Sequence, residues 1–463
     1  MGDPRVVVGG GVAALVAADT LAHAGQRVEL FVPEGPLCGG FASHKVAGRT
    51  LQLGLRLLEL DYGATSRPPP LEAYKPGPVG HAPYISLIRT WIDEMTDGEL
   101  FEVGRPRLAF EGRVHDDIHV TADLSPLRQI VGDETADLIA GEADRSMEHF
   151  GASGVFDAGV DLWEIDLETA SRANHGDTFH ERLIEPLCTK ITPNGSADVV
   201  AALRRKTWMP LYHPRTVGEA ARGREPSYRP YRPFHVDASG GCDTVVQRLI
   251  DRVVSHPLVE VNAVATLVAL GAGTRGRTNL AFSCGRSLDV ARPIIGLGAD
   301  EVFRACGIEY GSPRLQMHLA WTEVAEEDIA DDPSTILIGD ADLPALRVSH
   351  GGITRPGFRL HVVESAHDFA GPTAPLVADA LDRCGIARLG TPIEIVHELR
   401  AAIVRAPTRA AVAHHREGLE AFHNRALEVE LVGGILGPGA DSLNEQILQG
   451  ILVGAASDVA LHI

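Results

Sequence analysis

Residues 6–14 read VVVGGGVAA, a run that predicts a buried strand, a glycine-rich turn and the start of a helix. Gly9 permits a tight turn, Gly11 lets backbone N–H groups approach a pyrophosphate, and the small Ala14 permits close packing of helix against strand. The helix continues over Ala13–Ala24, and Val28–Val32 follows as a second strand. The N-terminus of such a helix carries a partial positive charge that favours phosphate. This stretch therefore predicts a dinucleotide-binding unit.

One residue typical of this unit is displaced. The second strand normally ends in an acid that hydrogen-bonds the adenosine ribose, roughly 20 residues past the glycines. This position holds Val32, followed by Pro33, and the nearest acid is Glu34. Either the loop after the strand lets Glu34 reach the ribose, or this contact is absent.

The composition is that of an acidic globular protein. The chain has 463 residues, of which 44% are hydrophobic, and a formal net charge of −20, which opposes binding to nucleic acid or anionic membranes. No apolar run reaches the roughly 18 residues of a membrane-spanning helix, and the first strand begins too early for a signal peptide. We therefore expect a soluble, cytoplasmic protein that acts on a small molecule, with its oligomeric state left open. The scattered cysteines predict reduced, mostly buried thiols: Cys38, Cys188, Cys242, Cys284, Cys306 and Cys384.

The pattern along the chain predicts two interleaved domains. We expect residues 1–62, 234–310 and 400–463 to form the dinucleotide-binding domain. Residues 63–233 and 311–399 are expected to form a second domain that binds the substrate.

Coarse secondary structure follows from the same pattern. Pro83–Phe234 reads as mostly helical and includes one long helix over Leu124–Phe150. Later stretches such as Leu315–Val324 suggest an antiparallel sheet. Near the end we expect a strand over Leu431–Leu436, a glycine turn and a helix from Ser442, which is the same strand–turn–helix order as in the first unit.

Further glycine motifs follow the N-terminal unit in a definite order. They are Gly39-Gly40, Gly48–Gly54 (GRTLQLG), Gly240-Gly241, Val264–Leu267, Ala291–Ile295, and Gly437-Pro438 with Asn444–Gly450. Together they resemble the flavoprotein superfamily that contains amine oxidases, phytoene-desaturase-like enzymes, protoporphyrinogen oxidase and UDP-galactopyranose mutase. The similarity is spread over most of the chain, and Phe179–Pro214, Arg347–Ser349 and Val363-Glu364 look closest to the mutase-like branch.

This resemblance implies an α/β fold with a discontinuous Rossmann-like FAD-binding domain and a second, α+β substrate domain. It implies FAD as the cofactor, bound by Gly9, Gly11, Ala14, Glu34, Gly39, Gly40, Val264, Gly437 and Asn444. The chain departs from the superfamily pattern at Pro438, where an Asp usually binds the ribityl or phosphate region. Asp441 and Glu34 are the acids that stand nearest to the two changed positions.

The resemblance also implies three catalytic candidates, each with a simpler structural alternative. Arg56 would lie on the side that faces the flavin, oriented by Glu59, or both residues belong to a surface element. His44 follows Gly39-Gly40 near the expected isoalloxazine ring, or it is an exposed loop histidine. Arg347 reaches into the substrate cavity, or it pairs with a carboxylate.

Two basic clusters are candidates for substrate contacts. Arg204 and Arg205, followed by Lys206, suit an anion pocket with Tyr212 as an aromatic wall, or they mark a helix end. The second cluster forms a lid or a plain solvated loop, and consists of Arg222, Arg224, Tyr228, Arg229, Tyr231 and Arg232. His115–His119 superficially resembles a metal cluster, but we predict a polar turn and no metal site because no further ligands accompany it.

The sequence leaves three functions open. The first is an FAD-dependent oxidoreductase of the amine oxidase or desaturase type that acts on a polar small molecule. The second is a redox-neutral, mutase-like isomerase of an anionic sugar nucleotide, in which residues 204–212 and Arg347 converge on a diphosphate. The third is a degenerate flavoprotein fold without flavin that serves as a binding or scaffolding subunit, as the changes at residues 32–34 and Pro438 suggest.

Overall fold

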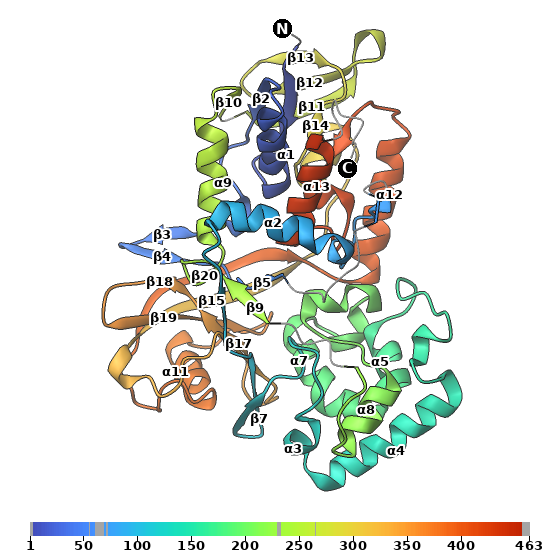
Figure 1. The fold of residues 1–463 in the computed structure, drawn as a ribbon, viewed down its shortest axis with the longest axis vertical. Coiled ribbons are helices and arrows are strands. Elements are labelled where there is room, and N and C mark those ends of the chain that lie inside the picture. Colours follow the sequence, from blue (N-terminus) through green and yellow to red (C-terminus); the bar gives the residue numbers. More distant parts are fainter. Residues whose placement is uncertain are drawn as a thin grey trace.

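The structure is a computed structural model and describes residues 3–54, 56–60, 69–70, 73–228, 233–263 and 265–455. Figure 1 shows a helix-flanked sheet at the top of the view, a second sheet at the lower left and a helical layer at the lower right. The mixed α/β class expected from the sequence is confirmed.

The first sheet has five strands, all parallel, in the order β10-β2-β1-β14-β21. This order places the glycine turn after β1 at the centre of the sheet, where the order of successive strands reverses and where dinucleotides bind in such folds. The strands are β1 (Arg5–Val8), β2 (Val28–Phe31), β10 (Val259–Asn262), β14 (Ile294–Ile295) and β21 (Glu430–Leu431).

Both faces of this sheet are covered, which explains the run of three valines, Val6–Val8, in β1. Val7 packs on a face covered by α1 (Val12–His23), α2 (Ile85–Thr96), α9 (Asp243–Ser255) and α13 (Leu443–Ala455). Val6 and Val8 face α10 (Ala299–Ala305), α12 (Arg409–His423) and the meander β11 (Leu267–Ala272), β12 (Thr278–Phe282) and β13 (Ser287–Val290).

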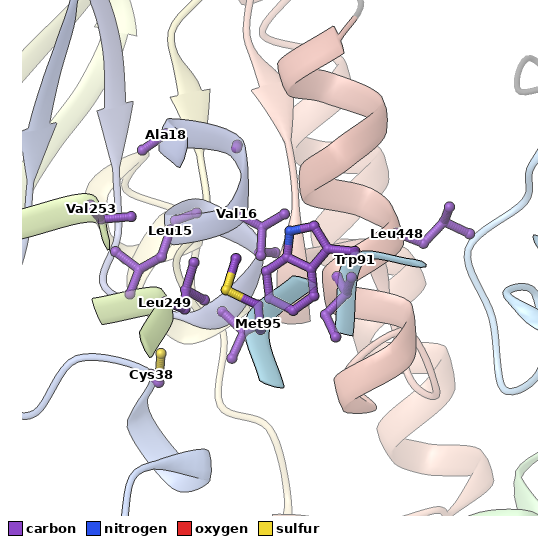
Figure 2. Close-up of a cluster of buried hydrophobic side chains, with 14 of the residues drawn as sticks. Leu15, Val16, Ala18, Cys38, Trp91, Met95, Leu249, Val253 and Leu448 are labelled. Carbon is purple, nitrogen blue, oxygen red and sulfur yellow. The ribbon is translucent and has the colours of Figure 1, made fainter. Parts of the chain in front are cut away.

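Helix α1 is apolar on every side because it is enclosed by other elements. Ten of its twelve residues are buried. Figure 2 shows Leu15 and Val16 of α1 together with Trp91 and Met95 of α2, and these residues belong to one hydrophobic cluster. The N-terminus of α1 is therefore held by the core of the molecule.

The second sheet has seven strands in the order β20-β15-β19-β17-β16-β7-β8. Its pairs are antiparallel except for β16 and β7, which run parallel. The strands are β7 (Arg107–Phe110), β8 (Arg113–Asp116), β15 (Arg314–Ala325), β16 (Thr335–Ile338), β17 (Ala345–His350), β19 (Phe358–Ser365) and β20 (Glu394–Arg405), and α11 (Thr373–Arg383) packs on one face.

A helical layer and two small sheets complete the fold. The main helices of the layer are α3 (Leu127–Val131), α4 (Asp133–Phe150), α5 (Leu167–His175), α6 (Asp177–Phe179), α7 (Glu185–Ile191) and α8 (Pro214–Ala221). One small sheet joins β3 (His44–Val46), β4 (Arg49–Leu51) and β18 (Gly352–Ile353) in the order β18-β4-β3. The other joins β5 (Leu58–Glu59), β6 (Phe101–Glu102) and β9 (Phe234–Val236).

Three predicted elements need correction. The helix expected over residues 124–150 is divided into α3 and α4 by Gly132, whose φ is +78°. The strand expected over residues 431–436 ends at Leu431, and a 3-10 helix, Gly433–Leu436, follows. The expected helical segment contains β6, β7 and β8, so His115 and Asp116 lie in a strand and not in a turn.

Two further expectations concern side chains and membranes. All six cysteines are free thiols and five are buried, which confirms the prediction. None of the helices within the described ranges has both the length and the apolar character needed to cross a bilayer.

Candidate active site

The turn between β1 and α1 is held by close backbone contacts. Gly9 has a φ of +136°, and its N–H donates to the carbonyl of Phe31 (2.8 Å). A Cβ on Gly9 would lie 2.4 Å from the carbonyl oxygen of Gly296, and a Cβ on Gly296 would lie 2.7 Å from that of Ala14. Only glycine fits at positions 9 and 296, and α1 consequently lies close against the sheet.

The first turn of α1 offers amides to an anion. Gly11 is the N-cap residue, and no acidic side chain lies in the first turn. The N–H groups of Gly11 and Val12 have no acceptor among the residues that the structure describes, and Gln446 Oε1 lies 3.5 Å from the nitrogen of Ala13. A Cβ on Gly11 would meet only Gln446 Oε1 and the Gly296 oxygen, both at 3.7 Å. Unpaired amides at the positive end of a helix dipole fit a diphosphate group.

The loop after β2 is exposed and has free space beside its glycines. Glu34, Gly39 and Gly40 are all exposed, and a Cβ on either glycine would meet no atom within 4 Å. Burial raises the pKa of the preceding Cys38 thiol to about 12, so this thiol is neutral. The predicted adenine contact at Val264 lies outside the described residues.

The predicted C-terminal flavin motif folds into a glycine turn followed by α13. Gly437 has a φ of +132° and lies against His415, whose Nε2 would be 3.6 Å from a Cβ there. The buried side chain of Asn444 donates to the carbonyl of Glu59 (2.8 Å). Asp441 accepts from Lys206. Burial alone would raise the pKa of Asp441, but the charge of Lys206 lowers it overall.

A pocket of about 200 Å³ lies where this domain meets the second sheet. Its polar lining consists of Gln52, Arg56, Asp332, Ser334 and His350, and the remaining lining residues are Leu57, Val103, Gly104, Val236 and Gly240. Arg56 donates to the carbonyl of Gly40, and its guanidinium lies 5.3 Å from the centre of the Phe41 ring. One pocket residue thus contacts the loop that carries Gly39 and Gly40.

The other predicted catalytic arginine lies in a buried ion pair. Arg347 of β17 donates to Glu364 of the adjacent β19, with Nη2–Oε1 and Nε–Oε1 distances of 2.5 Å and 3.1 Å. A Cβ on Gly54 would lie 3.2 Å from Glu364 Oε1 and 3.8 Å from Arg347 Nη2. Burial lowers the pKa of Arg56, and the charge of Arg347 lowers it further. The charges of Arg56 and Arg347 therefore lie close enough to interact.

His44, the third predicted catalytic residue, lies apart from the pocket. It is exposed on the edge strand β3 and does not line the pocket. The histidine that does line the pocket is His350, the last residue of β17, together with Asp332 from the loop before β16. Sequence analysis missed both residues, and the one available signal was a histidine at the end of a buried strand, just after Arg347.

The predicted substrate contacts lie elsewhere and have partners of their own. Arg205 pairs with Glu59 (3.2 Å), and Arg204 donates to the carbonyl of Ala201 (2.9 Å). Burial lowers the pKa of Arg204 to about 10. Tyr212 is buried in the helical layer, and its hydroxyl donates to the carbonyl of Ile118. None of these residues lines the pocket.

The second basic cluster is only partly described. Arg222 donates to Asp144 and to the carbonyl of Gly218, and Tyr228 stacks on His213 with ring centroids 5.5 Å apart. Arg229, Tyr231 and Arg232 lie outside the described residues. Within the described part of the chain, no group of three or more His, Cys, Asp or Glu side chains is arranged to hold a metal ion.

Comparison with known proteins identifies the fold. A family profile described as an NAD(P)-binding Rossmann-like domain matches residues 7–67. The sequence matches no curated protein. A reduced UDP-galactopyranose mutase is similar in structure, with a TM-score of 0.69, 12% identity, and coverage of 97% of this chain and 93% of that one.

Two further solved structures are similar over almost their whole length. A protein from an Exiguobacterium species assigned as a protoporphyrinogen oxidase has a TM-score of 0.63 and 15% identity, covering 98% of each chain. A putrescine oxidase has a TM-score of 0.57 and 13% identity, covering 98% of each chain. The chain therefore shares its fold with these three proteins, which confirms the fold that its motifs predicted.

Proposed function

We propose that this protein is an FAD-dependent oxidoreductase that oxidises a polar small molecule, such as an amine or an alcohol. The observation that carries the proposal is the contact of Arg56, a pocket residue, with Gly40 of the open loop beside the dinucleotide sheet. A ligand in the pocket and a dinucleotide across the sheet would lie on two sides of this contact.

The residues present fit the cofactor at its diphosphate. The amides of Gly11 and Val12 would hold the diphosphate, and Glu34 would reach the ribose from the loop after β2. Gly39 and Gly40 leave room for the flavin end, and the turn at Gly437 lies before α13. When bound, FAD supplies a two-electron acceptor.

The pocket itself orients the substrate. The side chains of Gln52, Arg56 and Ser334 line the pocket and can donate hydrogen bonds. Several donors suit a substrate with several polar groups. Leu57, Val103 and Val236 supply the apolar part, which excludes water from the reacting atoms.

The geometry favours an oxidoreductase over the isomerase of an anionic sugar nucleotide. That alternative requires residues 204–212 and Arg347 to converge on a diphosphate. Arg205, Lys206 and Arg347 instead each pair with a carboxylate, respectively Glu59, Asp441 and Glu364. Binding a diphosphate there would first require these pairs to break.

The first test is whether the purified protein binds FAD. A Gly11→Asp variant then tests whether FAD binds at the first turn of α1. Gly11 has a φ of −76° and room for a Cβ, so Asp should fold well there and act as a helix N-cap. Its carboxylate would accept from the backbone N–H of Ala13 or Ala14, and its negative charge would repel the diphosphate. We expect the wild-type protein to show the absorption bands of oxidised flavin, and Gly11→Asp to bind FAD at least 10-fold more weakly while remaining equally stable.

A Gly311→Asp variant is the control, because a Cβ at Gly311 meets no atom within 4 Å. Anaerobic addition of a panel of polar amines and alcohols should then bleach the flavin. A colourless protein that ignores added FAD would overturn the proposal in favour of a binding or scaffolding subunit. Bound flavin that must first be reduced, and is returned unchanged after turnover of a sugar nucleotide, would favour the isomerase.

A further inference from the structure

His350 lines the pocket, and one of its two ring nitrogens has no partner among the described residues. Its Nδ1 is buried and has no hydrogen-bond partner among the residues that the structure describes. Nδ1 lies 3.9 Å from the position that a Cβ on Gly240 would take, and Gly240 also lines the pocket. An unpaired buried acceptor is costly unless a ligand donates to it, so this atom marks a position for a donor group.

Asp332 lies on the other side of the same ring. Its Oδ2 lies 3.9 Å from Nε2 of His350, which is ion-pair distance. Arg359 of β19 holds Asp332 in turn, with an Nε–Oδ2 distance of 3.4 Å. A carboxylate on the Nε2 side favours the proton on Nε2 and leaves the lone pair on Nδ1.

Burial favours the neutral form of the His350 ring near pH 7. Burial lowers the pKa of His350, Arg359 lowers it further, and Asp332 opposes them. His361 of β19 faces it across the strand pair with ring centroids 6.3 Å apart, and burial lowers the pKa of His361 to about 4. Arg56 lines the same pocket from the opposite domain.

We propose that Nδ1 of His350 is the proton acceptor for a substrate N–H or O–H group in this pocket, and that Asp332 is its positioning residue. This proposal rests on the proposed function. Oxidation of an amine or alcohol removes two electrons and two protons. Bound FAD would supply the acceptor for the hydride from the carbon, and Nδ1 would take the proton of the N–H or O–H group as the C=N or C=O bond forms.

The first experiment measures the protonation state of the His350 imidazole directly and needs no substrate. The holoprotein with isotopically labelled histidine is titrated by NMR, and the His350 signals are assigned by their loss in His350→Gln. We expect a neutral ring at pH 7.5 with the proton on Nε2. The pKa of His350 should fall further in Asp332→Asn and rise in Arg359→Gln. A ring that carries its proton on Nδ1, or is charged at pH 7.5, overturns the proposal.

The second experiment measures flavin bleaching by the amine or alcohol that reacts with the wild-type protein. His350→Gln should lower the bleaching rate at least 100-fold and abolish the acidic limb of its pH profile, without changing FAD affinity. Asp332→Asn should move that limb to lower pH. His149→Gln, at the distant end of α4, is the matched control and should match the wild type. Normal bleaching in His350→Gln overturns this proposal alone, whereas absence of FAD binding by the wild-type protein overturns the proposed function.

Discussion

The side chain of Glu323 on β15 ties a small sheet to the large one. Arg49 of β4 donates Nε to Oε1 (2.6 Å) and Nη2 to Oε2 (2.8 Å), and Arg355 reaches Oε2 (3.0 Å). Thr354 also donates to this carboxylate. These bonds, chiefly those of Arg49, lower the pKa of Glu323 to about 2. They hold in place the strands that carry the predicted residue His44.

Replacing Glu323 by Gln should lower the free energy of unfolding by about 3 kcal/mol at pH 7, because a buried charge pair loses one partner. Since the folded-state pKa of about 2 lies below the ordinary 4.5, this stabilisation is complete above pH 4.5 and is lost as the pH falls towards 2. Denaturant unfolding at pH 7 and pH 3 should show a smaller difference from the wild type at pH 3. The matched control is Glu326→Gln, whose exposed ion pair with Arg359 should contribute less than about 1 kcal/mol. An equal difference at both pH values would contradict this account.

Helices α1 and α13 are packed at backbone distance. A Cβ on Gly450 would lie 2.6 Å from both the carbonyl oxygen of Ala13 and the Cβ of Val16, and one on Gly454 would lie 2.6 Å from the Cβ of Thr20. The two glycines of α13 therefore set the distance between the helices. This packing brings Gln446 of α13 to the first turn of α1.

Substituting Gly450 by Ala should lower the melting temperature, because the added methyl group forces the helices apart at a cost of about 1–3 kcal/mol. The control is Gly141→Ala in α4, where a Cβ would meet only Arg145 Nη1, at 3.8 Å. Alanine is the better helix former, so Gly141→Ala should gain about 0.5–1 kcal/mol. Thermal unfolding distinguishes the two, and an equal gain in both variants would show that α1 and α13 are not closely packed.

Ion pairs between distant parts of the chain join the helical layer to the dinucleotide domain. Lys206 lies in a 3-10 helix, Ala201–Thr207, and pairs with Asp441, two residues before α13. Arg205 of the same short helix pairs with Glu59. Both carboxylates adjoin the C-terminal motif, because Asp441 precedes α13 and the carbonyl of Glu59 accepts from Asn444 of α13.

A double-mutant cycle should measure this connection. Lys206→Met and Asp441→Asn each remove the pair, so their effects on the free energy of unfolding should not add, with a coupling energy of about 1 kcal/mol because both side chains are partly exposed. The same cycle on Lys206 and Asp342, which pairs with Arg383 elsewhere, should show no coupling. Additive effects of Lys206→Met and Asp441→Asn would mean that the pair contributes nothing to stability.

The parts of the molecule predictable from sequence are those whose partners are close along the chain. The run from Val6 to Val32 identified β1, α1 and β2 because strand, turn and helix signals are local. The pocket was not predictable in this way, because nothing local shows that His350 and Asp332 face Arg56. The run Arg204–Lys206 suggested an anion site for the same reason, since its carboxylate partners come from distant parts of the chain.

The five-stranded sheet has a consequence for biosynthesis, because its strands are spread from residue 5 to residue 431. A ribosome releases β1 and β2 early, but β10 emerges only after half the chain, β14 follows it, and β21 comes near the end. Until then the backbone N–H and C=O groups on the outer edges of β1 and β2 have no strand partners, and such edges promote aggregation. Pairing between strands far apart in sequence is also slow. The turn after β1 is complete only when Gly296 and α13 have been made, because it contacts Gly296 and Gln446.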